Sequence, residues 1–417
     1  LKLNSGHFFH PKYGTIYDVI ADLSLSHSPI DYVTVCSKLK EKGKLEEIGG
    51  ESFVLEIVED QASAANIYHY AKTVKDKAAM RELVRTAMRV ADMGVNYKGD
   101  AQEFIQEVEA SFFKLTNEAK SAGMVKLNSC LMSNLKELEN SSRNEGDVQG
   151  LSSGYPHLDN YLLGMQPGQL IILAARPAMG KTSLALNIAV NACSQSGLPV
   201  AIFSLEMLSH ELSMRVLSSR AKVDSGRIRK KNFQDQDLRN IGKVVQELSN
   251  FPIFINDAGD STVLDIQSQC RKIKSESGLG LIVVDYLQLM SSHNKALSRE
   301  QQISEISRSL KTMAKELECP VMALSQLNRG VEARPNKRPN TADLRESGAI
   351  EQDADIVMFV YRDEYYNPDT KEPGVAEIII GKNRSGEAGT AKLAWVGSYT
   401  SFENLAHENA VERQTNA

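Results

Sequence analysis

The sequence lacks any apolar stretch long enough to span a membrane. Its 417 residues contain no run of about 18 apolar residues, the length that a transmembrane helix requires. The opening segment, Leu1–Gly6, has no apolar core of the kind that signal peptides carry. It also has no initiator Met, so we expect the natural chain to begin upstream. These absences argue against a membrane role and predict a cytoplasmic protein.

Clustered cysteine and net positive charge are also missing. The net charge is −5, so any contact with nucleic-acid phosphates must be local, in a groove or a channel. The 42% apolar fraction is ordinary for a soluble protein, and the length predicts two or more domains. The cysteines form no CxxC pair, which argues against a zinc site and favours reduced thiols. The five cysteines are Cys36, Cys130, Cys193, Cys270 and Cys319.

Apolar residues recur at helical spacing through residues 1–120. We therefore predict an all-α N-terminal domain there, and favour a packing or docking module because it contains no catalytic constellation. Residues 121–150 are a predicted linker that carries one short amphipathic helix, Leu127–Leu138, before the polar run Asn140–Asp147. That helix could pack on its own domain or dock onto a neighbouring subunit, and the pattern leaves both open.

Residues 151–417 have a different pattern, in which short apolar runs alternate with helical segments. This alternation is typical of an α/β domain with a mostly parallel sheet and helices on its faces. The last two runs are predicted antiparallel strands. The predicted strands are Leu170–Ala174, Val200–Leu205, Ile253–Ile255, Leu281–Val284, Val321–Leu324, Ile356–Val360, Ala376–Ile380 and Leu393–Val396. The predicted helices include Ser183–Ser194, Val263–Glu276 and Gln301–Leu317.

A phosphate-binding loop is predicted directly after the first of these strands. The loop ends in Gly180-Lys181-Thr182 and precedes a helix, so backbone N–H groups and a helix N-terminus would point at phosphates. Lys181 suits the β- and γ-phosphates of ATP, and the Thr182 hydroxyl suits Mg²⁺. The usual pattern begins with Gly, and Ala175 holds that place here. The expected ATP-binding residues are Ala175, Arg176, Pro177, Ala178, Met179, Gly180, Lys181, Thr182 and Ser183.

Polar residues follow three other predicted strands. Glu206, Asp285 and Gln326 come at or just after the carboxyl ends of their strands. In open α/β sheets, ligands bind beyond those ends. Asp285 has the chemistry to help hold Mg²⁺, and Glu206 that of the base that polarises the attacking water. Gln326 can sense the γ-phosphate by hydrogen bonding. Each alone could be a strand cap, but three beside a phosphate loop predict a site for ATP hydrolysis.

Two later segments carry basic residues. Lys382 and Arg384 lie in a turn-like sequence after a strand, and we favour the interpretation that they reach the phosphates of a neighbouring subunit over two solvated charges. The long polar region Asn328–Asp355 mixes basic and acidic residues. Its composition is equally compatible with a solvated loop and with a loop that contacts DNA, and few aromatic residues are present to stack on bases.

Several segments together resemble DnaB-type helicases, and the similarity covers nearly the whole chain. Arg176-Pro177 within the phosphate loop is typical of that family, so Ala175 is a family feature. The segments in the α/β part are Ala174–Thr182, Phe203–Met207, Val284–Met290, Leu324–Arg329, Asp343–Asp355 and Lys382–Arg384. Those in the helical part are Gly43–Gly50 and Ala64–Ile67. The departure from the family is at the N-terminus, where we expect the family's opening helix to be absent.

The resemblance implies a RecA-like motor in a homohexameric ring, which moves 5′ to 3′ on single-stranded DNA using ATP and Mg²⁺ in a bacterial cell or a phage-infected host. It implies that Glu206 is the catalytic base and that Arg384, with Lys382, completes the neighbour's site. It places Arg345, Glu346 and Gly348 on the DNA path and Arg362 near the nucleotide. It further implies a helicase loader as a partner, an N-terminal collar that engages primase, and docking of Leu127–Leu138 on the adjacent subunit.

Two other functions share parts of this pattern. Another RecA-like ATPase, such as a recombinase or a clock-type hexamer, would share the phosphate loop and Glu206 without unwinding DNA. A nucleotide-switched binding module would bind ATP without turning it over, and the set Lys181, Glu206 and Arg384 argues against it. Strand-displacement and phosphate-release assays separate these alternatives.

Overall fold

The computed structural model divides the chain into two compact units, Leu1–Glu139 and Asn140–Ala417. Within the described residues, no helix combines the length and apolar character that crossing a membrane requires. The structure describes residues 3–26, 28–59, 66–101, 104–105, 107–108, 111–112, 127–128, 131–132, 135, 150–291, 298–344 and 348–405. The predicted docking helix Leu127–Leu138 therefore lies largely outside them.

The N-terminal unit is helical, as its sequence predicts. Its helices pack around a small apolar core in which Leu39 is fully buried. The start of the second helix has a local cause, because the Asp31 carboxylate accepts a hydrogen bond from Thr34 N at 2.8 Å and caps the free N–H groups. The elements are η1 (Ser5–His7), α1 (Pro11–Leu25), α2 (Tyr32–Glu41), α3 (Leu45–Ile48), α4 (Gly50–Glu59) and α5 (Ile67–Asn96).

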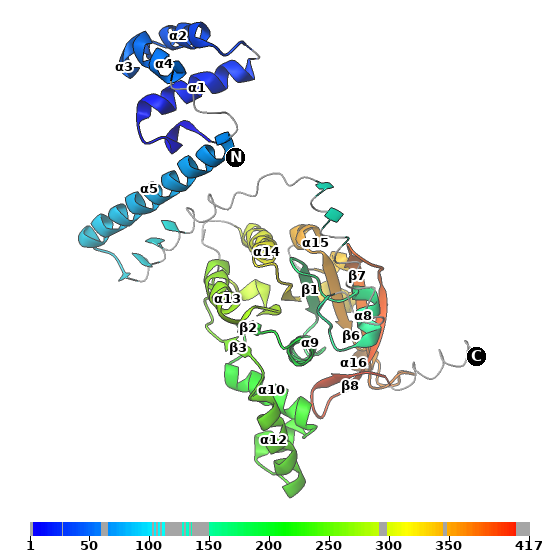
Figure 1. Cartoon of the computed structure of the whole chain (residues 1–417). Helices are drawn as coiled ribbons and strands as arrows, with labels where there is room; N and C mark the ends of the chain where they lie inside the picture. Colours follow the sequence, from blue (N-terminus) through cyan, green and yellow to red (C-terminus); the bar gives the residue numbers. More distant parts are fainter. Residues whose placement is uncertain are drawn as a thin grey trace. The chain divides into compact units, whose positions relative to one another are not determined.

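The described part of the second unit contains one nine-stranded sheet in the order β3-β2-β4-β5-β1-β6-β7-β8-β9 (Figure 1). The strands from β3 to β6 are parallel, and β7, β8 and β9 continue the sheet in antiparallel pairing. The strands are β1 (Leu170–Ala175), β2 (Val200–Ser204), β3 (Ile253–Asn256), β4 (Leu281–Asp285), β5 (Val321–Gln326), β6 (Ile356–Tyr361), β7 (Val375–Asn383), β8 (Gly389–Val396) and β9 (Ser401–Glu403).

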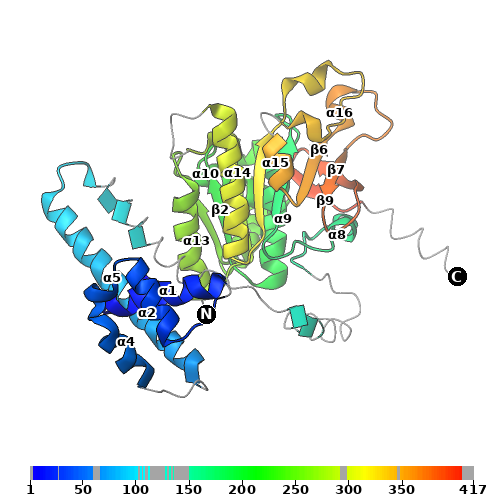
Figure 2. The same ribbon diagram turned by 90° about the horizontal axis from the view of Figure 1, so that it is seen from above.

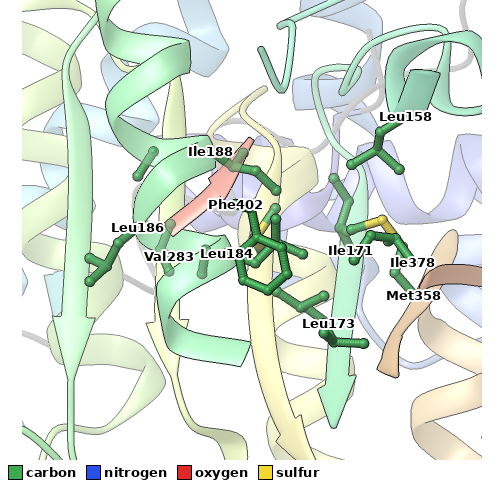
Figure 3. Packing of buried hydrophobic residues seen from close by; sticks show 14 of the residues in the cluster. Leu158, Ile171, Leu173, Leu184, Leu186, Ile188, Val283, Met358, Ile378 and Phe402 are labelled. Atoms are coloured by element: carbon green, nitrogen blue, oxygen red, sulfur yellow. The ribbon is translucent and has the colours of Figure 1, made fainter. Parts of the chain in front are cut away.

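Strand β1 divides the apolar core into two layers because alternate side chains point to opposite faces of the sheet. Ile171 and Leu173 pack with α8 (Pro156–Leu162) and α9 (Lys181–Ser196), as Figure 3 shows. Leu170 and Ile172 join the core on the other face, with α13 (Val263–Ser277), α14 (Arg299–Glu316) and α15 (Gly348–Asp353). Figure 2 shows α13 and α14 side by side. Helices on both faces explain why the central strands are apolar throughout.

The eight predicted strands and the three predicted helices are confirmed, with ends that differ by a few residues. Strand β9 and the helices between β2 and β3 were not predicted. These helices are α10 (Ser209–Ala221), α11 (Ser225–Lys230) and α12 (Asp235–Leu248). They form a small core of their own around Val223, Ile228 and Val244. The apolar residues of α12 do recur at helical spacing in the sequence, so this helix could have been predicted.

Outside residues 345–347, the polar region Asn328–Asp355 contains more regular structure than its composition suggests. It contains η4 (Arg329–Ala333), η5 (Thr341–Asp343) and α15. Arg334 pairs with Asp343 at 2.6 Å, and Arg338 pairs with the Glu377 carboxylate at 2.6 Å. Two basic side chains of this region therefore form ion pairs within the domain. The other short elements of this unit are η3 (Leu287–Leu289) and α16 (Asp363–Tyr366).

Truncating the core tests this packing. Leu173 has no exposed surface, so Leu173→Ala should lower the free energy of unfolding by about 2–5 kcal/mol through lost burial and a residual cavity. Leu264→Ala, at a side chain that is 40% exposed, should cost less than about 1 kcal/mol. Urea unfolding followed by the fluorescence of Trp395, the single tryptophan of the chain, measures both. Equal losses would contradict the assignment of Leu173 to the core.

Candidate nucleotide-binding site

The loop between β1 and α9 has the backbone shape of a phosphate cradle. Ala178 and Gly180 adopt left-handed conformations, with φ of 65° and 97°. A Cβ added to Gly180 would lie 3.0 Å from ring carbons of Trp395 and Phe402, so this position requires glycine for two reasons. The loop leads straight into α9, whose first N–H groups have no partner within the helix. The loop that the sequence predicts to bind phosphate therefore lies at a helix N-terminus.

The polar strand ends meet this loop on one edge of the sheet. Asp285 ends β4, Gln326 ends β5, and Glu206 follows β2 by two residues. The Thr182 hydroxyl donates to Asp285 Oδ2 at 2.7 Å, and Lys181 Nζ lies 3.5 Å from Asp285 Oδ1. The parallel strands bring these residues together although Lys181 and Gln326 are 145 positions apart in the sequence.

The charges in the site are partly shielded from water. The Lys181 side chain is 14% exposed and that of Asp285 is 3% exposed. Burial lowers the pKa of the Lys181 ammonium, whereas the nearby carboxylates of Asp285 and Glu206 act to raise it. Asp285 Oδ1 is buried and accepts no hydrogen bond. A buried carboxylate oxygen beside a threonine hydroxyl is the kind of oxygen donor set that suits Mg²⁺.

A cavity of about 370 Å³ lies in front of the loop. The predicted residues Glu206 and Gln326 line it, together with all the predicted loop residues except Met179, whose side chain is buried in the core. The Arg176 guanidinium donates to Glu332 Oε1 and to the Leu327 carbonyl, both at 2.9 Å, and so holds the loop against η4. The predicted loop residues on the cavity wall are Ala175, Arg176, Pro177, Ala178, Gly180, Lys181, Thr182 and Ser183.

Arg362 lies beside the cavity. Its guanidinium stacks on the Trp395 ring at 4.6 Å and donates to the Ala178 carbonyl at 3.2 Å. Burial lowers its pKa. Trp395, from β8, lines the cavity and was not predicted. Stacked planar groups at the rim of a phosphate site are suited to hold an aromatic base.

Several further cavity residues were missed by the sequence reasoning. Arg215 comes from α10, and Ser225 and Arg229 come from α11. These helices come soon after β2 and Glu206 but have no recognisable motif, so nothing local marks their basic residues. Tyr286 follows Asp285, and its ring lies 4.5 Å from Lys181 Nζ. The remaining missed residues on the cavity wall are Met207 and Thr400.

Lys382 and Arg384 lie at the opposite end of the sheet from the phosphate loop. β7 runs antiparallel to β6, so its last residues pair with the first residues of β6. Arg384 contacts Asp355, which in turn binds the N–H of Leu170 at the start of β1. The length of β1, about 17 Å at 3.3 Å per residue, separates them from the loop of the same subunit. Of the predicted DNA-contacting residues, Gly348 begins α15, and Arg345 and Glu346 lie outside the described residues.

An arginine in the cavity gives a direct test of the site. Arg215 lines the cavity, and a hydrogen bond to a charged group contributes about 1.5–3 kcal/mol. Arg215→Gln should therefore raise the Kd for ATP by about 10- to 100-fold. Arg239→Gln is the matched control, because Arg239 bonds to Gln236 on its own exposed helix face. Nucleotide titration of both variants measures the effect, and unchanged binding in Arg215→Gln would place Arg215 outside the nucleotide site.

A phosphate loop, a helix N-terminus and polar ends of parallel strands define this unit as a RecA-like P-loop nucleotide-binding domain. The chain belongs to the DnaB-like helicase family. The model of the DnaB-like helicase C-terminal domain matches residues 150–404, and that of the N-terminal domain matches residues 1–76.

The individual relatives agree with this family. The chain is 41% identical to the replicative DNA helicase DnaC of Bacillus subtilis strain 168 over 95% of this chain and 88% of that protein. It is 40% identical to the replicative DNA helicase DnaB of Geobacillus stearothermophilus, with the same coverage. A solved DnaB-like replicative helicase, described with its interactions with primase, has a TM-score of 0.79 at 33% identity and covers 97% of this chain and 94% of that chain.

Proposed function

We propose that the cavity binds ATP with Mg²⁺. Hydrolysis of this ATP drives 5′-to-3′ movement of the protein on single-stranded DNA. Membership of the DnaB-like family makes the chain a replicative DNA helicase. The observation that carries the ATPase proposal is the convergence of Lys181, Glu206, Asp285 and Gln326 on one edge of the sheet. A nucleotide-switched binding module would not need a carboxylate such as Glu206 beside the phosphate loop.

Each residue of this edge has a role that follows from its position. Lys181 and the N–H groups of the loop hold the β- and γ-phosphates. Glu206 accepts a proton from the attacking water, and Gln326 hydrogen-bonds the γ-phosphate. Thr182 and Asp285 would hold Mg²⁺, which supplies positive charge against the phosphate oxygens when bound. Arg362 and Trp395 hold the base.

The neighbouring subunit completes the site. Lys382 and Arg384 are separated from their own phosphate loop by the length of β1, which supports a role at the site of another subunit. We therefore propose a homohexameric ring with ATP at its interfaces, in which the phosphate loop and Glu206 come from one side and Arg384 from the other. An arginine supplied in trans stabilises the charge of the transition state.

The ring proposal extends to DNA and protein partners. Arg345, Glu346 and Gly348 are proposed to line the DNA path through the ring. The solved relative described with primase supports primase as a partner of the N-terminal domain, and a helicase loader completes the proposed partners. We propose domain bounds of 1–120 and 151–417, with residues 121–150 as a linker whose helix docks on the adjacent subunit. The proposed location is the cytoplasm.

Unwinding of forked DNA tests the function. One fork carries a free 5′ single-stranded tail and the other only a 3′ tail, and strand displacement is followed with ATP for wild type and Glu206→Ala. We expect wild type to open only the fork with the 5′ tail, because loading and movement begin on that strand, and we expect the variant to open neither. Unwinding of the 3′-tailed fork alone would reverse the proposed polarity.

ATP hydrolysis without displacement of either fork would contradict the helicase proposal and favour another RecA-like ATPase. Phosphate release, measured on the same samples, separates this result from a loss of catalysis. Absence of hydrolysis in wild type with bound ATP would instead support the nucleotide-switched module.

A further inference from the structure

Another cavity of the second unit lies apart from the site that the sequence predicts. Its volume is about 400 Å³, which is in the range of cavities that hold small molecules. Among the described residues, it shares no lining residue with the cavity in front of the phosphate loop. Two helices and a strand enclose it: α9 supplies Asn187 and Asn191, α10 supplies Ser219 and Arg220, and β9 supplies Ser401 and Phe402.

Hydrogen bonds between these elements fix the walls of the cavity. Asn187 Nδ2 donates to Ser219 Oγ at 2.9 Å, and Asn187 Oδ1 accepts from Phe402 N at 3.0 Å. The hydroxyls of Ser219 and Ser401 are bonded to each other at 2.9 Å. The Tyr155 hydroxyl donates to the Phe402 carbonyl at 3.0 Å. The cavity is therefore preformed, so a ligand would spend little free energy on ordering its walls.

Arg220 lines this cavity without a partner for its side chain. Its Nε is buried and has no hydrogen-bond partner among the described residues. Burial raises the pKa of the Tyr155 hydroxyl, while the positive charge of Arg220 acts to lower it, so the guanidinium lies near the Tyr155 wall. Buried polar atoms in folded proteins nearly always have a partner. An arginine of this kind therefore has N–H donors left for the acceptors of a ligand.

The charges on the cavity wall favour an anion. Lys222 and Glu403 also line the cavity and pair with each other at 3.0 Å, with side chains that are 61% and 34% exposed. An exposed ion pair is weak, so Lys222 can exchange Glu403 for a ligand. With Arg220, the wall carries two positive charges against one negative charge, and such a surface attracts negatively charged molecules.

The arrangement of donors suits a phosphate group better than a carboxylate. Side-chain N–H groups come from separate parts of the wall, namely Arg220 of α10, Asn191 of α9 and Asn404 just beyond β9. A carboxylate offers two oxygens in one plane, whereas a phosphate ester offers three that point in different directions. A guanidinium binds a phosphate through two parallel hydrogen bonds. Val190 and Val216 provide apolar wall for the organic part of a ligand.

We propose that the cavity between α9, α10 and β9 is a second binding site, which takes a small phosphate ester. Arg220 holds the phosphate group, and the organic part packs on Val190 and Val216. This site is separate from the cavity that is proposed to bind ATP, and it does not depend on the proposed hydrolysis.

The test measures the binding of small probes to the full chain by saturation-transfer NMR. Glycerol phosphate carries a phosphate ester, glycerate carries a carboxylate on a similar body, and glycerol carries no charge. We expect glycerol phosphate to bind with a Kd of about 1 mM, as suits a ligand of this size. Glycerate should bind about tenfold more weakly because it makes fewer charge-assisted hydrogen bonds, and glycerol should not bind.

Arg220→Gln should raise the Kd of glycerol phosphate by about tenfold or more, because the charge-assisted hydrogen bonds are lost. Lys181→Ala should leave this Kd unchanged, since Lys181 lines only the other cavity. Arg239→Gln is the matched control for the loss of charge, because Arg239 bonds to Gln236 on an exposed helix face, and it should also bind as wild type does.

Arg220→Gln breaks no hydrogen bond of the buried Nε, so its midpoint in urea should equal that of wild type. If this variant does not fold, Arg220→Lys replaces it. Lysine keeps the charge but lacks the planar fork of the guanidinium, so the Kd should rise by about threefold or more.

No saturable signal from glycerol phosphate in wild type, or an unchanged Kd in a folded Arg220 variant, would overturn the inference. Glycerate that binds as tightly as glycerol phosphate would overturn the phosphate class. Loss of binding in Lys181→Ala would place the probe at the phosphate loop and so overturn the second site.

Discussion

Replacing Glu206 by glutamine is expected to reduce ATP hydrolysis by about 10²- to 10⁴-fold. The amide has the size of the carboxylate but cannot accept the proton of the attacking water. Glu206 is exposed on the cavity wall after β2, so its replacement leaves the core unchanged. Nucleotide affinity should stay within about threefold of wild type, because Lys181 and the loop are intact. Phosphate release and titration with a fluorescent ATP analogue measure the two quantities.

Glu247→Gln is the matched control for this result. Glu247 is an exposed carboxylate on α12, so the change in net charge is the same while the cavity is untouched. We expect wild-type hydrolysis from the control. Hydrolysis in Glu206→Gln above about a tenth of the wild-type rate would show that another group accepts the proton.

Arg384→Ala is expected to reduce hydrolysis by about 10³- to 10⁵-fold, the contribution of an arginine that reaches the transferred phosphoryl group in trans. Its own phosphate loop lies at the far end of β1, so nucleotide binding within the same subunit should persist. The measurement is again phosphate release with a parallel binding titration. Lys371→Ala, which removes an exposed cation in the same unit, should leave both unchanged.

Mixed rings decide whether Arg384 acts in trans. Arg384→Ala subunits retain Lys181, and Lys181→Ala subunits retain Arg384, so an interface between the two can contain one complete site. We expect a mixture to hydrolyse ATP well above either variant alone. A mixture as inactive as its components, under conditions where subunits exchange, would contradict the trans role.

The sheet and the phosphate loop could be predicted because their causes are local. Each central strand is a short apolar run, since helices cover both faces of a parallel sheet. The loop is recognised from Gly180, Lys181 and Thr182 because a strand precedes them and a helix follows. Asp285, Gln326 and Glu206 could be placed on one edge since the carboxyl ends of parallel strands meet there.

Other parts of the site come from elements without a local signal. Arg215 of α10 and Arg229 of α11 line the cavity, and Trp395 lines it from β8, which pairs antiparallel with β7. Lateral pairing and helix packing depend on residues far apart in the chain, so no single window of sequence contains them. The polar composition of Asn328–Asp355 likewise does not reveal that Arg334 and Arg338 are used in ion pairs within the fold.

The sequence by itself determined the family, the phosphate loop and the identity of the groups suited to ATP hydrolysis, because these depend on residue types at fixed local spacing. Only the tertiary structure decided that Lys382 and Arg384 lie a full strand length from their own loop, and that Asp355 binds Arg384 there. The reason is that β7 runs antiparallel to β6, so the end of β7 lies beside the start of β6, at the opposite end of the sheet from the phosphate loop.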